Sequence, residues 1–171
     1  MVCTSKGRKE GTGGKVLRLV VAISYRKGVI ICEPYEKMTD AYFSNFIDRN
    51  FNTMFQTVDK GNSRIWVQDG DPSQNSAIGK SAMSGANSTL LKLPPRSPDS
   101  HPIENLFHIA SNKLKLQAVS QNITKESFEE FKQRAVNTMY SIRIETINNL
   151  IESMNARLND VIRYKGNRTR Y

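Results

Sequence analysis

The sequence predicts a mixed α/β layer fold, in which strands form a sheet that helices flank. Three observations predict it: two β-branched strands joined by a short turn, helical spacing of apolar residues directly after them, and two later strands that alternate with helical segments. A chain of 171 residues with a hydrophobic fraction of 38% can build one ordinary core.

The first strands are the clearest elements. Residues 16–24 (VLRLVVAIS) and 29–32 (VIIC) are short and rich in β-branched side chains, and residues 25–28 end in a glycine that favours a turn. We expect an antiparallel hairpin. Before it, residues 1–14 (MVCTSKGRKEGTGG) are rich in Gly, Lys and Arg, which predicts a flexible basic arm or loop.

A helical pattern follows. Thr39 is a plausible N-cap, and the apolar residues after it recur at helical spacing: Tyr42, Phe43, Phe46, Ile47 and Phe51. A second short helix is expected over residues 54–58. A turn at residues 60–63 leads to a third strand at residues 64–68 (RIWVQ), which the sequence DGDP at residues 69–72 ends.

The C-terminal half is mainly helical. We expect a small helix at residues 75–83, a strand at 89–93, and a stiff loop at 94–102, where four prolines restrict φ. Pro102 suits the first turn of a helix that begins near Ile103. Two long amphipathic helices follow. We expect the folded domain to span residues 15–162 and residues 163–171 (RYKGNRTRY) to form a basic tail.

Composition excludes several classes of protein. The 25 Lys and Arg against 16 Asp and Glu give a net charge of +9, which favours an anionic partner such as nucleic acid. Cys3 and Cys32 with two histidines are too few for a disulfide scaffold or a zinc centre, so we expect free thiols. No apolar run is long enough to cross a membrane.

Two carboxylates are candidates for chemistry. Asp69 follows an apolar strand, at the end where α/β sheets bind ligands, although its local sequence favours a simple turn. Glu104 lies in the first turn of a helix, where an acid often only complements the helix dipole. The proline-rich loop before Glu104 is stiffer than a helix cap requires. Together the two could hold hard divalent cations, but a two-metal site normally needs a third carboxylate.

The residues around these acids resemble a known family. Residues 66–72 (WVQDGDP) and 93–105 (LPPRSPDSHPIEN) are similar to the second and third acidic motifs of Tc/mariner-type (DDE) transposases, with 34 residues between Asp69 and Glu104. The resemblance implies a ribonuclease H-like fold, a mixed sheet flanked by helices. It also implies cut-and-paste DNA transposition by two Mg²⁺ (or Mn²⁺) ions, with Asp69 and Glu104 as catalytic metal ligands. Asp99 maps onto a loop position of the motif.

The chain also departs from this family. The family's first catalytic Asp lies on a strand before the hairpin, and we expect both that strand and that acid to be missing, since only Glu10 precedes the hairpin. The modules that bind transposon ends would lie upstream. The motif differs at residues 72–74 (PSQ) and at Ser100 and His101. We therefore expect a transposase fragment that is inactive alone and binds metal weakly.

The same resemblance predicts the partners of the chain, and two alternative functions remain open. It implies a double-stranded DNA partner, a possible homodimer, no membrane and a nuclear location. Candidate DNA contacts are Lys6, Arg8, Lys9 and Arg96, although a solvated loop explains the first three equally well. Two alternatives are a non-catalytic DNA-binding or oligomerisation module reused by a host, and an unrelated α/β phosphatase or nuclease.

Overall fold

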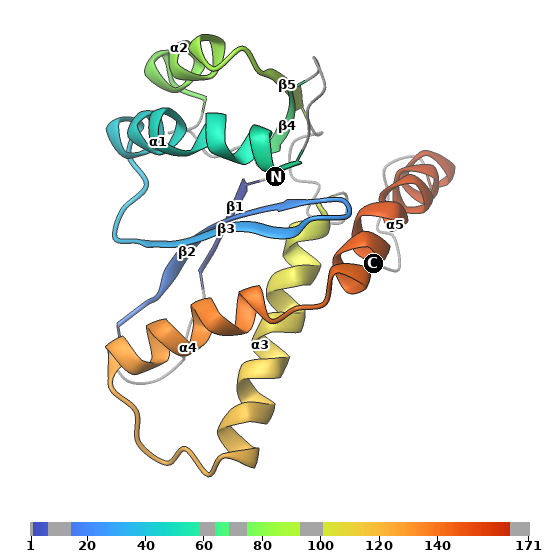
Figure 1. The fold of residues 1–171 in the computed structure, drawn as a ribbon. Coiled ribbons are helices and arrows are strands. Elements are labelled where there is room, and N and C mark those ends of the chain that lie inside the picture. The colour runs from blue at the N-terminus through green and yellow to red at the C-terminus, as the bar shows by residue number, and fades with distance from the viewer. Residues whose placement is uncertain (1, 7–14, 59–63, 69–74, 93–100, 165–171) are drawn as a thin grey trace.

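The structure is a computed structural model that describes residues 2–6, 15–58, 64–68, 75–92 and 101–164. Its centre is a five-stranded mixed sheet with the strand order β3-β2-β1-β4-β5 (Figure 1). The strands are β1 (Val2–Lys6), β2 (Arg18–Ser24), β3 (Gly28–Tyr35), β4 (Ile65–Gln68) and β5 (Thr89–Lys92). β1 is antiparallel to β2 and parallel to β4, and β4 is parallel to β5. The predicted α/β class and the predicted hairpin of β2 and β3 are confirmed.

Strand β1 corrects two predictions. Residues 1–14 were expected to form a flexible arm, and the first strand was expected to be missing, yet Val2–Lys6 pairs between β2 and β4. The segment VCTSK mixes strand-favouring Val2 and Thr4 with Ser5 and Lys6 and precedes a Gly- and Lys-rich stretch, so its strand signal is weak by itself. Pairing on both sides supplies the backbone hydrogen bonds that local sequence does not reveal.

The helices are α1 (Asp40–Val58), α2 (Ala77–Gly85), α3 (Pro102–Ser120), α4 (Phe128–Tyr140) and α5 (Ile144–Arg163). α1 is a single helix where the sequence suggested two. Thr39 caps it as predicted, because its hydroxyl accepts a hydrogen bond from the Tyr42 N–H at 3.1 Å. Ser127 caps α4 through a capping box with Glu130.

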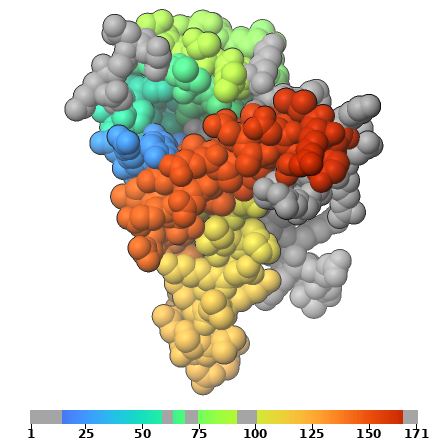
Figure 2. Space-filling view, turned by 90° about the vertical axis from the view of Figure 1, so that its right-hand side faces the viewer, coloured from blue at the N-terminus to red at the C-terminus, as the bar shows by residue number. Residues whose placement is uncertain are grey.

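Alternation along β2 assigns its side chains to two cores, because successive residues of a strand point to opposite faces. Val20 and Ala22 pack with α1 and α2, whereas Leu19, Val21 and Ile23 pack with α3, α4 and α5. Figure 1 shows α1 and α2 on one side of the sheet and α3 and α4 on the other. The space-filling view shows α5 as a long exposed ridge, and the far end of α3 projecting from the body (Figure 2).

The free edge of β3 is protected from pairing with other strands. Pro34 lies on it and cannot donate a backbone hydrogen bond. The N–H of Cys32 donates to the Tyr140 hydroxyl at 3.0 Å. Burial raises the pKa of the Cys32 thiol to about 12, so this free cysteine is unreactive at neutral pH.

Candidate functional site

The predicted site lies where β4 ends and α3 begins. Asp69 is outside the described residues, as are Asp99 and Arg96, so the structure gives no distance between Asp69 and Glu104. It does describe Gln68, the last residue of β4, which is buried with 4% of its surface exposed. The Trp66 indole N–H donates to the Gln68 side-chain oxygen at 3.0 Å. This pair fixes the end of the strand that leads into Asp69.

Glu104 lies in the first turn of α3, as predicted. Its backbone N–H donates to the His101 carbonyl at 3.2 Å, and its side chain is exposed to solvent. The neighbouring side chains Ile103, Leu106 and Phe107 are buried in the core beside β2. The helix is therefore anchored on its apolar face, while its first turn presents Glu104 outward.

The central strand β1 contributes no acid. Its sequence is VCTSK, and Glu10, the first carboxylate of the chain, lies outside the described residues. The place of a first strand in the sheet is thus filled, but by residues that offer no carboxylate ligand. Of the predicted DNA contacts, Lys6 ends β1, and Arg8 and Lys9 lie outside the described residues.

His101, noted in the sequence only as a departure from the family motif, has an environment that the sequence did not predict. It is the N-cap residue of α3 and is 4% exposed, and neither ring nitrogen has a hydrogen-bond partner within the described structure. The side-chain nitrogen of Gln68 is likewise buried and unpaired there. Burial lowers the pKa of His101 to about 4, so the ring is neutral at pH 7. No periodic pattern marks the burial of such a residue, because its burial depends on tertiary packing.

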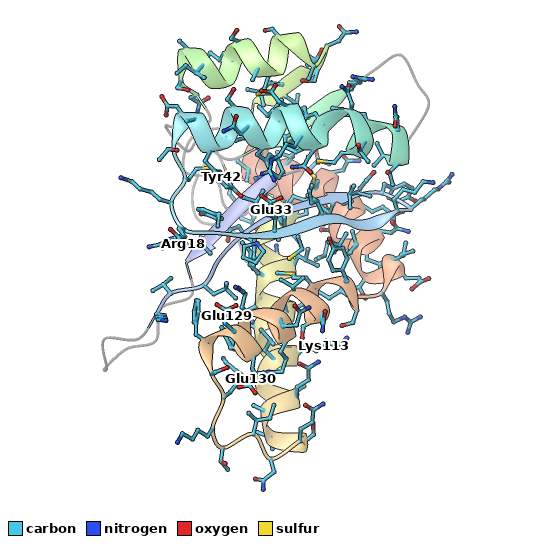
Figure 3. The ribbon with its side chains drawn as sticks, turned by 60° about the vertical axis from the view of Figure 1, so that its left-hand side comes forward. Arg18, Glu33, Tyr42, Lys113, Glu129 and Glu130 are labelled. Atoms are coloured by element: carbon cyan, nitrogen blue, oxygen red, sulfur yellow. The ribbon has the colours of Figure 1, made fainter. Side chains whose placement is uncertain are left out.

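Other carboxylates have structural partners. Glu33 on β3 accepts hydrogen bonds from the Tyr42 hydroxyl at 2.8 Å and from Arg49 at 2.9 Å (Figure 3). Burial, together with the Glu33 hydrogen bond, raises the pKa of Tyr42. Glu130 accepts the Ser127 N–H at 2.7 Å. These groups hold elements together and offer no reactive site.

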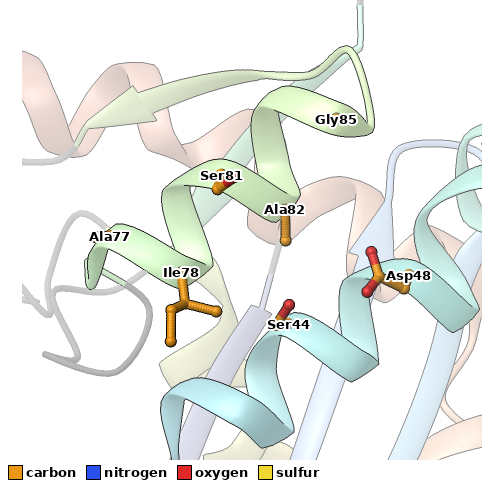
Figure 4. A pocket seen from close by; sticks show the side chains of 7 residues that line it. All are labelled: Ser44, Asp48, Ala77, Ile78, Ser81, Ala82 and Gly85. Carbon is orange, nitrogen blue, oxygen red and sulfur yellow. The ribbon is translucent and has the colours of Figure 1, made fainter.

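The described residues contain no group of three His, Cys, Asp or Glu side chains placed to hold a metal ion. A groove of about 580 Å³ lies between α1 and α2, and it offers one carboxylate, Asp48, among small and apolar side chains (Figure 4). The other lining residues are Ser44, Ala77, Ile78, Ser81, Ala82 and Gly85. Such a lining provides no catalytic group. Within the described parts of the chain, no helix is both long and apolar enough to span a bilayer.

Comparison with known proteins identifies the family. The profile of the DDE superfamily endonucleases matches residues 4–127. The Tc3 transposase of Caenorhabditis elegans is 38% identical over 82 residues, which cover 48% of this chain and 24% of that protein. The Tcb1 transposase of Caenorhabditis briggsae is 28% identical over 132 residues, covering 77% of this chain and 46% of that protein. The chain therefore spans less than half the length of both relatives.

Solved structures agree on the fold. The catalytic domain of Mos1 transposase, solved with raltegravir and manganese, superposes with a TM-score of 0.79 at 18% identity, covering 98% of this chain and 82% of that one. The Mos1 strand transfer complex gives a TM-score of 0.70 at 18% identity, with 95% of this chain and 47% of that chain covered. The ribonuclease H-like fold expected from the sequence is thereby supported, and an unrelated phosphatase or nuclease is excluded.

Proposed function

Because this chain belongs to the DDE superfamily endonucleases, and within them to the Tc/mariner-type transposases, we propose that it forms part of the catalytic domain of a cut-and-paste DNA transposase. The observation that carries the proposal is the pair of acidic motifs on this fold. One motif begins on β4 and continues through Asp69, and the other places Glu104 in the first turn of α3. Both mark the sites of metal ligands in the family.

The carboxylate groups of Asp69 and Glu104 are of the chemical type that binds divalent cations. Carboxylate oxygens are the ligands that Mg²⁺ and Mn²⁺ prefer, and solved Mos1 structures contain Mn or Mg. Asp69 and Glu104 would hold the metal, which when bound would activate a water or a 3′-hydroxyl for attack on a phosphodiester. The buried side chains around Ile103 keep α3 in place, so that Glu104 is positioned before metal arrives.

We further propose that this chain alone does not cleave DNA. The central strand β1 carries no carboxylate, so a site built from Asp69 and Glu104 has two anionic ligands where two cations need about three. Weak binding of one ion removes several kcal/mol of transition-state stabilisation, on the order of a thousandfold or more in rate.

Metal binding and strand cleavage test these two statements separately. Mn²⁺ titration followed by electron paramagnetic resonance should show one weak site that Glu104→Gln removes, with Glu129→Gln on α4 as the matched control. A supercoiled plasmid incubated with protein and Mg²⁺ should stay intact. Robust nicking abolished by Asp69→Ala would overturn the proposed inactivity, and Mn²⁺ binding unchanged in Glu104→Gln would overturn the metal site.

A second function, favoured by the net charge of +9, is DNA binding or oligomerisation without catalysis. It predicts duplex binding that weakens as salt rises, in the absence of any metal. Failure to bind duplex DNA at about 50 mM salt would exclude this function. A DNA substrate also implies a nuclear location and permits a homodimer, which imaging of a tagged chain and sedimentation analysis would respectively test.

A further inference from the structure

The turn between β2 and β3 has an unusual backbone. The Lys27 N–H donates to the Ser24 carbonyl at 3.3 Å, which closes a four-residue turn. Arg26 within it has a φ of 63°, in the left-handed region. The only other described non-glycine residues with positive φ are Asn87 and Asn122. Asparagine tolerates this conformation, whereas for arginine it is strained.

Helix α5 holds this turn in place. The Arg26 N–H donates to the Asn148 side-chain oxygen at 2.7 Å, and the Tyr25 hydroxyl donates to Glu152, one turn further along α5, at 2.5 Å. Gly28 packs so closely that an added Cβ would lie 3.2 Å from Ile144. Figure 1 shows the hairpin turn beside α5. Two hydrogen bonds and one close contact thus fix a strained turn on a helix.

The turn also presents positive charge. Arg26 and Lys27 are exposed, and neither takes part in an ion pair within the described structure. The Arg26 guanidinium lies over the Tyr25 ring, 5.4 Å from its centroid, which orients it. On α5, Glu152 accepts from the Tyr25 hydroxyl, and Glu145 pairs with Arg143 at 3.3 Å. The positive charge of the turn is therefore available to an external anion.

We propose that this turn, through Arg26 and Lys27, contacts the phosphate backbone of duplex DNA, a contact that uses neither Asp69 nor Glu104. The inference rests on the proposed function, which supplies DNA as the partner. A position that Gly or Asn would occupy without strain carries Arg, so the side chain is needed for more than the turn. Guanidinium groups bind phosphate oxygens in a bidentate manner, and a turn already fixed by α5 loses little entropy on binding.

Substitution by asparagine separates charge from turn geometry. Arg26→Asn keeps a residue that tolerates positive φ, so folding stability should be equal or higher by thermal denaturation. Duplex DNA affinity, measured by fluorescence anisotropy with a labelled oligonucleotide, should fall roughly three- to tenfold at about 50 mM salt. The slope of log K against log salt should decrease by about 0.9 for Arg26→Asn and by about twice that with Lys27→Asn added.

Three further variants act as controls. Arg26→Lys retains the charge and should retain the salt slope. Lys80→Asn removes an exposed cation on α2 and should leave both affinity and slope unchanged. Asn148→Ala removes the hydrogen bond that holds Arg26 and should weaken binding by less than Arg26→Asn does. This last result would link the rigidity of the turn to affinity.

The outcomes distinguish the two proposals. A loss of affinity and slope in the asparagine variants, but not in Lys80→Asn, supports the DNA contact. If the wild-type chain binds DNA and the asparagine variants bind it equally well, this inference is wrong while the proposed function stands. If the wild-type chain binds no DNA at low salt, both this inference and the DNA partner are wrong.

Discussion

The two faces of the sheet are built from different side chains. The face under α1 and α2 is aromatic: Phe51 and Trp66 lie with ring centroids 4.4 Å apart, and Phe43 and Phe46 are fully buried. The face under α3, α4 and α5 is mainly aliphatic. The aromatic face takes most of its bulk from one helix, while the aliphatic face draws on three consecutive helices at the C-terminal end of the described chain.

Because the two cores differ in this way, they contribute differently to stability and to the candidate site. Glu104 belongs to α3, whose buried residues pack only in the aliphatic core, and the clamped hairpin turn contacts α5 on the same side. Among the described residues, the aromatic core includes no residue of α3 or α5, and it reaches the candidate site only through Trp66, which holds Gln68 at the end of β4. Damage to the aromatic core away from Trp66 should therefore lower stability without changing the hairpin turn, whereas damage to the aliphatic core should also affect ligand binding.

The largest effect is expected in the aromatic core. Phe51→Ala removes a ring that is fully buried against Phe55 and Trp66, and should lower the free energy of unfolding by about 3–5 kcal/mol. Urea denaturation measures this loss. The DNA affinity of the folded fraction should be unchanged. A loss of affinity beyond the fraction unfolded would contradict the separation of the two faces.

Lowering the pH should destabilise the fold through His101, which lies at the start of α3. Burial holds the pKa of His101 near 4, below its ordinary value of 6.5. As pH falls from 6.5 towards 4 the unfolded chain takes up a proton that the folded chain does not, so stability decreases, by up to about 3 kcal/mol in total. Above pH 6.5 both states are neutral and the effect vanishes.

His101→Asn tests the origin of this pH dependence. Urea midpoints of the variant should be nearly flat between pH 6.5 and 4.5. Carboxylates with lowered pKa values, such as Glu126, lose their contribution to folding stability only at lower pH. Parallel decreases in wild type and variant would show that another group is responsible.

The helix caps offer a matched comparison. Ser127 caps α4 on the aliphatic side and Thr39 caps α1 on the aromatic side, each accepting one backbone N–H. Either change to alanine should cost about 1 kcal/mol, measured by thermal denaturation. Ser127→Ala should cost more, because the capping box also loses the reciprocal bond to Glu130. An equal or smaller cost would mean that the second bond adds nothing.

The smallest expected effect comes from one matched substitution in each core, which compares the two cores directly. Ile47 and Ile147 are equally buried, one in each core. Valine at either position should cost about 0.5–1.5 kcal/mol. Ile147 lies near Gly28 of the hairpin turn, so only Ile147→Val should also weaken DNA binding. Equal DNA affinities in the two variants would argue against coupling between α5 and the turn.

Elements with strong local patterns were predicted correctly. The hairpin, the Thr39 cap and the long helices follow from β-branched runs, a capping residue and helical spacing. Trp66, on the strand predicted at residues 64–68, lies in the core and is 3% exposed. The prediction of a flexible arm at residues 1–14 was wrong for Val2–Lys6, because VCTSK becomes a strand only through its partners β2 and β4. His101 was noted only as a departure from the motif, and its burial was not predicted because a lone histidine leaves no periodic signal.

By itself the sequence determined the family, the hydrophobic faces of the helices and the two acidic motifs, because each is encoded by residues close together in the chain. Only the tertiary structure decided that β1 lies at the centre of the sheet, that His101 is buried beside Glu104, and that α5 clamps the Arg26 turn. These features join segments separated by tens of residues. Their energies arise from pairing and burial, which no local pattern contains.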